Sequence, residues 1–136
     1  MSKVDEALAL FKEGFSCSQA VFAVYAADYG MDQKMALKIS QAFGGGMGGM
    51  RGECGAVTGA YMVISLIYGR TDAADGESRL KTFNLVRDFN KRFKEVHQAS
   101  VCKELLDGKS GNHYDMCSEY VRTACEILNE LLEIEE

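Results

Sequence analysis

The sequence predicts an all-α protein, a compact single-domain bundle of about six or seven helices over residues 1–136, with one glycine-rich loop. Apolar residues recur at steps of three and four along most of the chain, and no strand pattern competes with them. Proline is absent, and the glycines lie at the ends of the predicted helices or cluster between Gly44 and Gly59. With 136 residues, of which 47% are hydrophobic, the chain can bury one core and is too short for two comfortable domains.

The first four helices are expected at Ser2–Glu13, Ser16–Tyr29, Asp32–Phe43 and Gly52–Tyr68. The first begins as an amphipathic pattern directly after the N-terminus, without the apolar segment of a secretory signal. Ser16 and Gln19 form a predicted capping box, which makes Cys17 the first residue of the second helix. The third helix ends where the glycine cluster begins. The fourth contains the longest apolar stretch, which is too short to cross a bilayer.

The last three helices are expected at Asp75–Gln98, Ser100–Leu106 and Asp115–Glu133. The long helix from Asp75 repeats apolar residues every three or four positions and carries Lys and Arg on its other face, which is typical of an amphipathic rod. The short helix ends just before Gly108. Asp115 is the predicted cap of the last helix, and the acidic residues at its far end oppose the helix dipole, so fraying is expected there.

Charge and cysteine content limit the function classes. The formal net charge is −5 and no basic stripe is present, which argues against a nucleic-acid surface and against a polybasic membrane anchor. The expected compartment is the cytoplasm. Five cysteines in a reducing cytoplasm are not expected to form a static disulfide framework, so redox or metal chemistry becomes their expected use.

Four of the five cysteines fall where the sequence predicts the first turn of a helix. They are Cys17, Cys54, Cys102 and Cys117. The N-terminus of a helix carries unpaired N–H groups and the positive end of the dipole, so a thiolate is favoured there and the pKa of the thiol is expected to be lowered. Cys125 instead shares a core face with Val121 and Leu128. His97 and His113 are candidate bases or ligands near Cys102 and Cys117.

Six of the nine residues from Gly44 to Gly52 are glycine. Such a cluster implies left-handed backbone angles, a close approach of another backbone, or N–H groups turned inward to hold an anion. The expected ligand-binding residues of this loop are Gly44, Gly45, Gly46, Gly48 and Arg51. The loop follows a helix and lacks the Gly-Lys-Ser/Thr ending of a P-loop, so a nucleotide motif is not supported.

A small-residue face follows Cys54, formed by Gly55 and Gly59 together with Ala56 and Ala60. Small residues at this spacing let another helix approach closely. Packing within the chain is the preferred interpretation of this face, and a homodimer built through it or through the long helix is the alternative.

The cysteine motifs carry a resemblance to a known family. They are Gly-Phe-Ser-Cys-Ser-Gln-Ala-Val at 14–21, the glycine run from 44, Cys-Gly-Ala-Val-Thr-Gly at 54–59, and then Cys102 and Cys117. This order closely resembles the redox-active protein family named for its C_GCAxxG_C_C cysteine pattern, over nearly the whole chain. The resemblance implies thiol-based redox activity and assigns the four cysteines to it, with Cys125 as an extra. A related module resembles part of split-Soret cytochromes, but this chain has no Cys-x-x-Cys-His for covalent haem.

Three function classes remain open at this stage. In the first, Cys54 attacks a disulfide or peroxide, Cys17 resolves, and Cys102 and Cys117 form a second pair across the loop from Asp107 to Tyr114. The redox partner is not identified by the sequence, and neither is enzymatic turnover. In the second, the four thiolates hold zinc or an iron–sulfur cluster, although no pair is spaced as in ordinary sites. In the third, the chain is a non-catalytic, dimeric interaction module.

Overall fold

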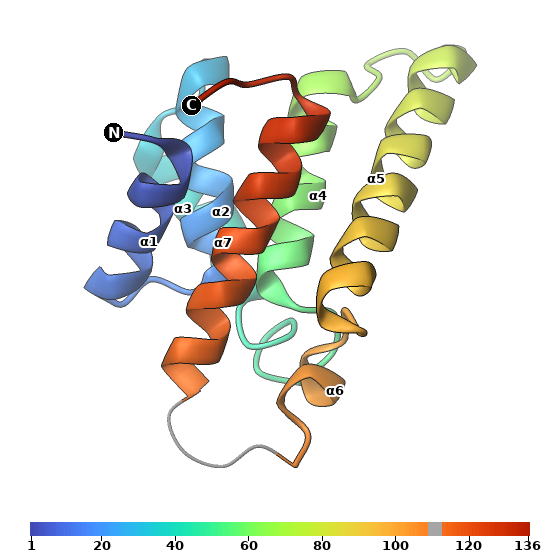
Figure 1. Cartoon of the computed structure of the whole chain (residues 1–136). Helices are drawn as coiled ribbons and strands as arrows, with labels where there is room; N and C mark the ends of the chain where they lie inside the picture. Colours follow the sequence, from blue (N-terminus) through green and yellow to red (C-terminus); the bar gives the residue numbers. More distant parts are fainter. Residues whose placement is uncertain (109–112) are drawn as a thin grey trace.

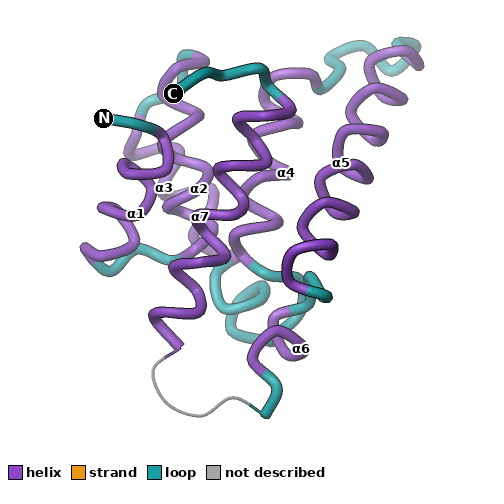
Figure 2. Tube along the Cα trace, viewed as in Figure 1, coloured by secondary structure: helices purple, strands orange, loops and turns teal. Residues whose placement is uncertain are grey.

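The computed structural model describes residues 1–108 and 113–136 of the chain. Its elements are α1 (Lys3–Glu13), α2 (Cys17–Ala26), η1 (Ala27–Tyr29), α3 (Gln33–Ser40), η2 (Gln41–Phe43), α4 (Gly55–Tyr68), α5 (Gly76–His97), α6 (Cys102–Leu106) and α7 (His113–Leu131). Helices account for all regular elements of these residues, and Figure 2 shows no strand among them. The predicted all-α class is therefore confirmed.

The helices pack side by side around α2 and α7. Helix α2 contacts α1, α3, α4 and α7, and helix α7 also contacts α1, α4 and α5. Figure 1 shows α5 at the outer edge of the bundle. Among the described helices, its extensive contacts are with α4 and α7. Both termini lie at one end of the bundle, and the glycine-rich loop and α6 lie at the other. This second end is where the cysteines meet.

The small-residue face of α4 packs against α2 of the same chain. A Cβ atom added at Gly59 would lie 2.9 Å from the carbonyl oxygen of Ser18, and one at Gly55 would lie 3.3 Å from the Cβ of Cys17. Side chains at these positions would push the two helices apart. Packing within the chain therefore uses this face, as the preferred interpretation held, and α2 is buried along almost its whole length.

The helix boundaries lie within about three residues of the predicted ones, and the largest difference in a helix start is at α4, which begins at Gly55 rather than Gly52. The capping box of α2 is present, with the Ser16 N–H donating to Gln19 Oε1 at 3.0 Å and the Gln19 N–H donating to Ser16 Oγ. Helix α7 begins at His113, so Asp115 lies inside its first turn and the prediction that Asp115 caps it is wrong. A carboxylate in the first turn interacts favourably with the helix dipole, as a capping carboxylate does, so an acidic residue near the helix start could be mistaken for the cap.

The acidic end of the chain leaves the helix early and is held by side-chain contacts. Helix α7 ends at Leu131, and Glu133 has a φ of 57°. The Glu136 carboxylate accepts hydrogen bonds from the Lys3 N–H and from Asn129 Nδ2. In the part of the chain that the structure describes, no helix has the length and apolar composition needed to span a bilayer.

Candidate functional site

Four cysteines from four helices line one small cavity at the loop end of the bundle. Cys17 and Cys102 are the first residues of α2 and α6, Cys54 immediately precedes α4, and Cys117 is the fifth residue of α7. The cavity has a volume of about 40 Å³, and Gly45, Gly46, Arg51 and Tyr120 also line it. Three of the cysteines thus lie at the start of a helix, whereas Cys117 lies one turn further along its helix. The volume suits a single water and excludes an organic ligand inside.

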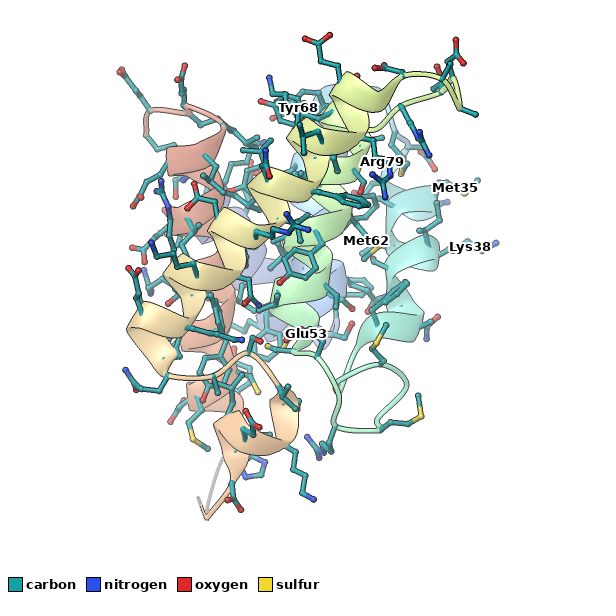
Figure 3. The ribbon with its side chains drawn as sticks, turned by 90° about the vertical axis from the view of Figure 1, so that its right-hand side faces the viewer. Met35, Lys38, Glu53, Met62, Tyr68 and Arg79 are labelled. Carbon is teal, nitrogen blue, oxygen red and sulfur yellow. The ribbon has the colours of Figure 1, made fainter. Side chains whose placement is uncertain are left out.

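Cys54 and Cys102 are brought together by a short antiparallel contact between two chain segments. Glu53 and Val101 form an isolated antiparallel bridge. On either side of it, the Cys54 N–H donates to the Ser100 carbonyl at 2.8 Å and the Cys102 N–H donates to the Gly52 carbonyl at 2.6 Å. Side chains alternate across an extended segment, so the two cysteines share the face opposite to Glu53 and Val101. Figure 3 shows Glu53 at the start of α4, at the loop end of the bundle.

The glycine-rich loop closes this end by folding on itself in a left-handed conformation. Positive φ angles occur at Gly45, Gly46, Met47, Gly48, Gly49 and Arg51. The N–H groups of residues 47–52 donate to carbonyls of residues 42–47, and the Gly44 N–H donates to Gln41. Gly44 and Gly48 therefore have no free N–H for an anion. The N–H groups of Gly45 and Gly46, which line the cavity, make no hydrogen bond to any residue that the structure describes.

Glycine is required at position 46 by space as well as by backbone angle. Its φ is +73°, and an added Cβ would lie 2.6 Å from the Gly52 nitrogen and 2.7 Å from the Arg51 Cα. Backbone atoms cannot move aside as the end of a flexible side chain can. The two halves of the loop approach each other this closely because residue 46 has no side chain.

Cys17 and Cys117 line the same cavity, and their pKa values are shifted in opposite directions. The Cys117 pKa is lowered from 9.0 to about 7, first because the Cys17 thiol donates a hydrogen bond to its thiolate and also because the positive charge of Arg51 is near. The Cys17 pKa is raised well above its ordinary value, by the same hydrogen bond, by burial and by the neighbouring cysteines. Of the two thiols, Cys117 therefore ionises first. Cys117 is also partly exposed to solvent.

The expected lowering of the Cys54 pKa is wrong. The backbone N–H groups of Ala56 and Val57 at the start of α4 lower the Cys54 pKa, as a helix start should, although the Cys54 side chain accepts no capping hydrogen bond. Burial outweighs them, because the side chain is only 4% exposed, and the Cys54 pKa rises to about 12. The sequence placed Cys54 inside a helix that begins at Gly52, whereas Cys54 immediately precedes α4, and the sequence contained no measure of how deeply the thiol is buried.

Arg51 stands at the boundary between the cavity and the solvent. Its φ of 62° is unusual for a residue with a side chain, and the loop holds it by a hydrogen bond from its N–H to the Gly45 carbonyl. Its guanidinium Nη1 donates to Cys102 Sγ at 3.6 Å, and this contact raises the Arg51 pKa. Arg51 therefore contacts the cysteine cavity, and its expected role in binding a ligand stays a prediction.

The donor chemistry of the cavity suits zinc or an iron–sulfur cluster, but the arrangement of the donors does not. Thiolate sulfur is a preferred ligand of both. Within residues 1–108 and 113–136, no three His, Cys, Asp or Glu side chains are arranged so that they could hold a metal ion. The four cysteines all belong to these residues, so their present positions do not fit such a group.

The two histidines and Cys125 lie outside the cavity. His97 Nε2 is 2.9 Å from Thr123 Oγ1, and its ring packs against Phe93 and Tyr120. Cys125 is fully buried, and burial raises its pKa to about 12. His113 lines a neighbouring cleft rather than the cavity.

Tyr120 also lines the cavity, and no sequence motif singled it out. Its hydroxyl donates to the Leu105 carbonyl at 3.2 Å, which fixes α6 against α7. Its pKa is raised, first by burial and then by the nearby Cys117, Cys54 and Cys102. The periodicity that marked Tyr120 as apolar could not show which end of the core it reaches.

The fold and the site define a class: an all-α protein in which four cysteines line one cavity. Residues 15–131 match the sequence profile of the family described as "Putative redox-active protein (C_GCAxxG_C_C)". The chain belongs to this family, as the motifs predicted. Comparisons with curated proteins and with solved structures gave no match.

Proposed function

We propose that the chain is a dithiol–disulfide redox protein in which Cys117 attacks and Cys17 resolves. The observation that supports this best is the position of Cys117, which is partly exposed and shares the cavity with Cys17, together with a pKa lowered to about 7. A thiol with a pKa near ambient pH combines a large thiolate fraction with good nucleophilicity. This assignment replaces Cys54, whose pKa of about 12 keeps it protonated at neutral pH.

The reaction is an exchange with an organic disulfide. The Cys117 thiolate attacks one sulfur of the substrate, a new S–S bond forms to Cys117, and the substrate bond breaks so that one thiolate leaves with the electron pair. Cys17 then attacks the Cys117 sulfur and the second substrate thiolate leaves, taking up the proton that Cys17 held. Two electrons pass from the protein dithiol to the substrate, and the protein ends with a Cys17–Cys117 disulfide.

Cys54 and Cys102 are proposed as a second pair of the same site. The antiparallel contact at Glu53 and Val101 places both on one face beside the first pair. This differs from the sequence-based pairing of Cys17 with Cys54 and of Cys102 with Cys117. Residues 109–112, in the loop across which that second pairing was expected, lie outside the described residues.

The test is exchange with a small neutral disulfide, bis(hydroxyethyl) disulfide, under anaerobic conditions. We expect the unmodified protein to release two thiols per reacted chain and to keep no adduct. Cys17→Ser should release one thiol and retain the mixed disulfide on Cys117, whereas Cys117→Ser should react slowly. Cys125→Ser is the matched control and should behave like the unmodified protein. Fast exchange in Cys117→Ser, or an adduct on Cys54, would refute the assignment.

A four-cysteine metal or cluster site is the second candidate, because all four sulfurs line one cavity. It requires the cysteines to move from their present positions, since no metal-holding group exists among the described residues. Metal and acid-labile sulfide analysis of anaerobically purified protein separates the two functions. The thiol reading also implies a reducing compartment, such as the cytoplasm, where the five free cysteines would stay reduced.

A homodimer remains a proposal, and the structure narrows where it could form. The small-residue face of α4 already packs against α2, whereas the outer side of α5 exposes Leu80 and Phe83. Arg79 on this helix lies over the Phe83 ring, with its guanidinium carbon 4.5 Å from the ring centroid. Figure 3 shows Arg79 on the same face of the molecule as Met35 and Met62.

A further inference from the structure

A surface cleft opens beside the four-cysteine cavity, between the glycine-rich loop, α6 and the start of α7. It has a volume of about 260 Å³ and is lined by Arg51, Lys103, Leu106, Asp107, Gly108 and His113. Arg51 and Leu106 line the cavity as well as the cleft. The two spaces are therefore neighbours across these two side chains, and a small molecule in the cleft lies next to the cysteines.

The cleft presents positive charge on a protein that is negative overall. Arg51 and Lys103 are both exposed, and no carboxylate of the described residues lies within 4.0 Å of either side chain's nitrogens. Asp107 is the carboxylate among the lining residues. The chain as a whole has a formal net charge of −5, so two cations without a carboxylate partner here create a local field that attracts anions.

The backbone keeps these two cations together. The Lys103 N–H donates to the Arg51 carbonyl at 3.1 Å, which continues the antiparallel contact that brings Cys54 and Cys102 together. The same ladder that brings the cysteines into one cavity thus fixes Lys103 beside Arg51. Arg51 in turn reaches Cys102 with its guanidinium, so it touches both the thiol site and the cleft.

We propose that this cleft binds the carboxylate of a small disulfide and thereby sets the substrate class: low-molecular-weight disulfides that carry an acidic group. The proposal rests on the proposed function, because the bound molecule is the disulfide that Cys117 attacks in the exchange described above. Arg51 and Lys103 hold the carboxylate in the cleft, and the disulfide bond extends past Leu106 toward the cavity. The volume accommodates one arm of such a molecule, which is smaller than a drug-sized ligand.

The test compares three simple disulfides whose arms have the same two-carbon spacing and differ in charge. They are dithiodipropionate, which is anionic, bis(hydroxyethyl) disulfide, which is neutral, and cystamine, which is cationic. Initial exchange rates with the whole protein are measured at pH 7 and low salt, and the adduct at Cys117 is followed in the Cys17→Ser variant. We expect the anionic disulfide to react fastest and the cationic one slowest.

Lys103→Gln tests the cleft without removing the arginine that contacts Cys102. A unit charge about 4 Å away in water changes an equilibrium by about fivefold, so the exchange rate with dithiodipropionate should fall by about fivefold. The rate with cystamine should rise relative to the rate with bis(hydroxyethyl) disulfide. Lys91→Gln, an exposed change on α5 outside the cleft, is the matched control and should leave the preference intact. Added salt should weaken the preference in the unmodified protein.

Three outcomes separate this proposal from the function on which it rests. A preference for the anionic disulfide that Lys103→Gln removes supports the cleft. Equal rates for the three disulfides, or an equal slowing of all three by Lys103→Gln, overturn the cleft and leave thiol exchange standing. No reaction at Cys117 with any of the three, in a protein whose Cys117 is shown to be free, overturns the proposed function itself.

Discussion

Removing the Cys17 thiol should change the pH dependence of Cys117 in a specific way. The hydrogen bond from Cys17 is the largest cause of the lowered Cys117 pKa, so Cys17→Ala should move that pKa from about 7 back toward its ordinary 9.0. At pH 7 the thiolate fraction then falls from about one half to about one hundredth. The more basic thiolate is intrinsically more nucleophilic, by roughly sixfold to tenfold for a shift of this size. The net exchange rate at pH 7 should therefore fall by about sixfold.

The same reasoning predicts that the order of the two proteins reverses at high pH. Above about pH 10 the Cys117 thiol of both proteins is ionised, and the Cys17→Ala protein should react faster by roughly sixfold to tenfold because its thiolate is more basic. Cys17→Ser keeps a hydroxyl donor and should give an intermediate Cys117 pKa. The assay is the initial rate of adduct formation at Cys117 with bis(hydroxyethyl) disulfide between pH 6 and pH 10.5, identified by peptide mapping. Superimposable profiles for Cys17→Ala and the unmodified protein would refute the reasoning.

Three further predictions concern stability and assembly. Gly46→Ala places a Cβ 2.6 Å from the Gly52 nitrogen at a φ of +73°, and should lower the free energy of unfolding in urea by about 2–5 kcal/mol. Gly76→Ala, which has open space around it, should change that free energy by no more than about 0.5 kcal/mol, and equal losses in the two variants would contradict the packing argument. Burial raises the pKa of Cys125 to about 12, so above about pH 9 the native state holds a proton that the unfolded state loses. The unfolding free energy should therefore fall between about pH 9 and pH 12, and should fall less steeply in Cys125→Ala. The same pH dependence in the variant and the unmodified protein would exclude this thiol as the cause. If the outer side of α5 mediates a dimer, Phe83→Glu should yield a monomer by light scattering, and a monomeric unmodified protein would remove the proposal.

The helices and their caps were predictable because they depend on local chemistry. Ser16 and Gln19 form the capping box that their spacing predicts, since both partners lie within one turn. The small residues of α4 likewise signalled a close helix contact, and the structure supplies α2 as the partner. The prediction that Asp115 caps the last helix was wrong for a local reason as well, because an acidic residue in the first turn and one at the cap interact with the helix dipole in a similar way.

The chemistry of the cysteines could not be predicted because it depends on contacts between distant segments. Nothing near Cys54 in sequence shows that its side chain is 4% exposed, and that burial reverses the direction of its pKa shift. Cys17 and Cys117, which lie together in the cavity, are 100 residues apart in sequence (117 − 17), on α2 and α7. The antiparallel contact between Glu53 and Val101 is a single bridge with no strand pattern around it, so no periodicity announces it.

In the proposed function the four cysteines act as thiols, and Cys17 and Cys117 are the reacting pair. The most direct measurement is disulfide mapping of anaerobically purified protein after one equivalent of a mild oxidant, with metal, acid-labile sulfide and free thiols determined on the same sample. We expect a metal-free protein that loses two thiols per chain on oxidation and gains a Cys17–Cys117 disulfide. Metal or sulfide in stoichiometric amount with the thiols masked, or a first disulfide that omits Cys117, would contradict it.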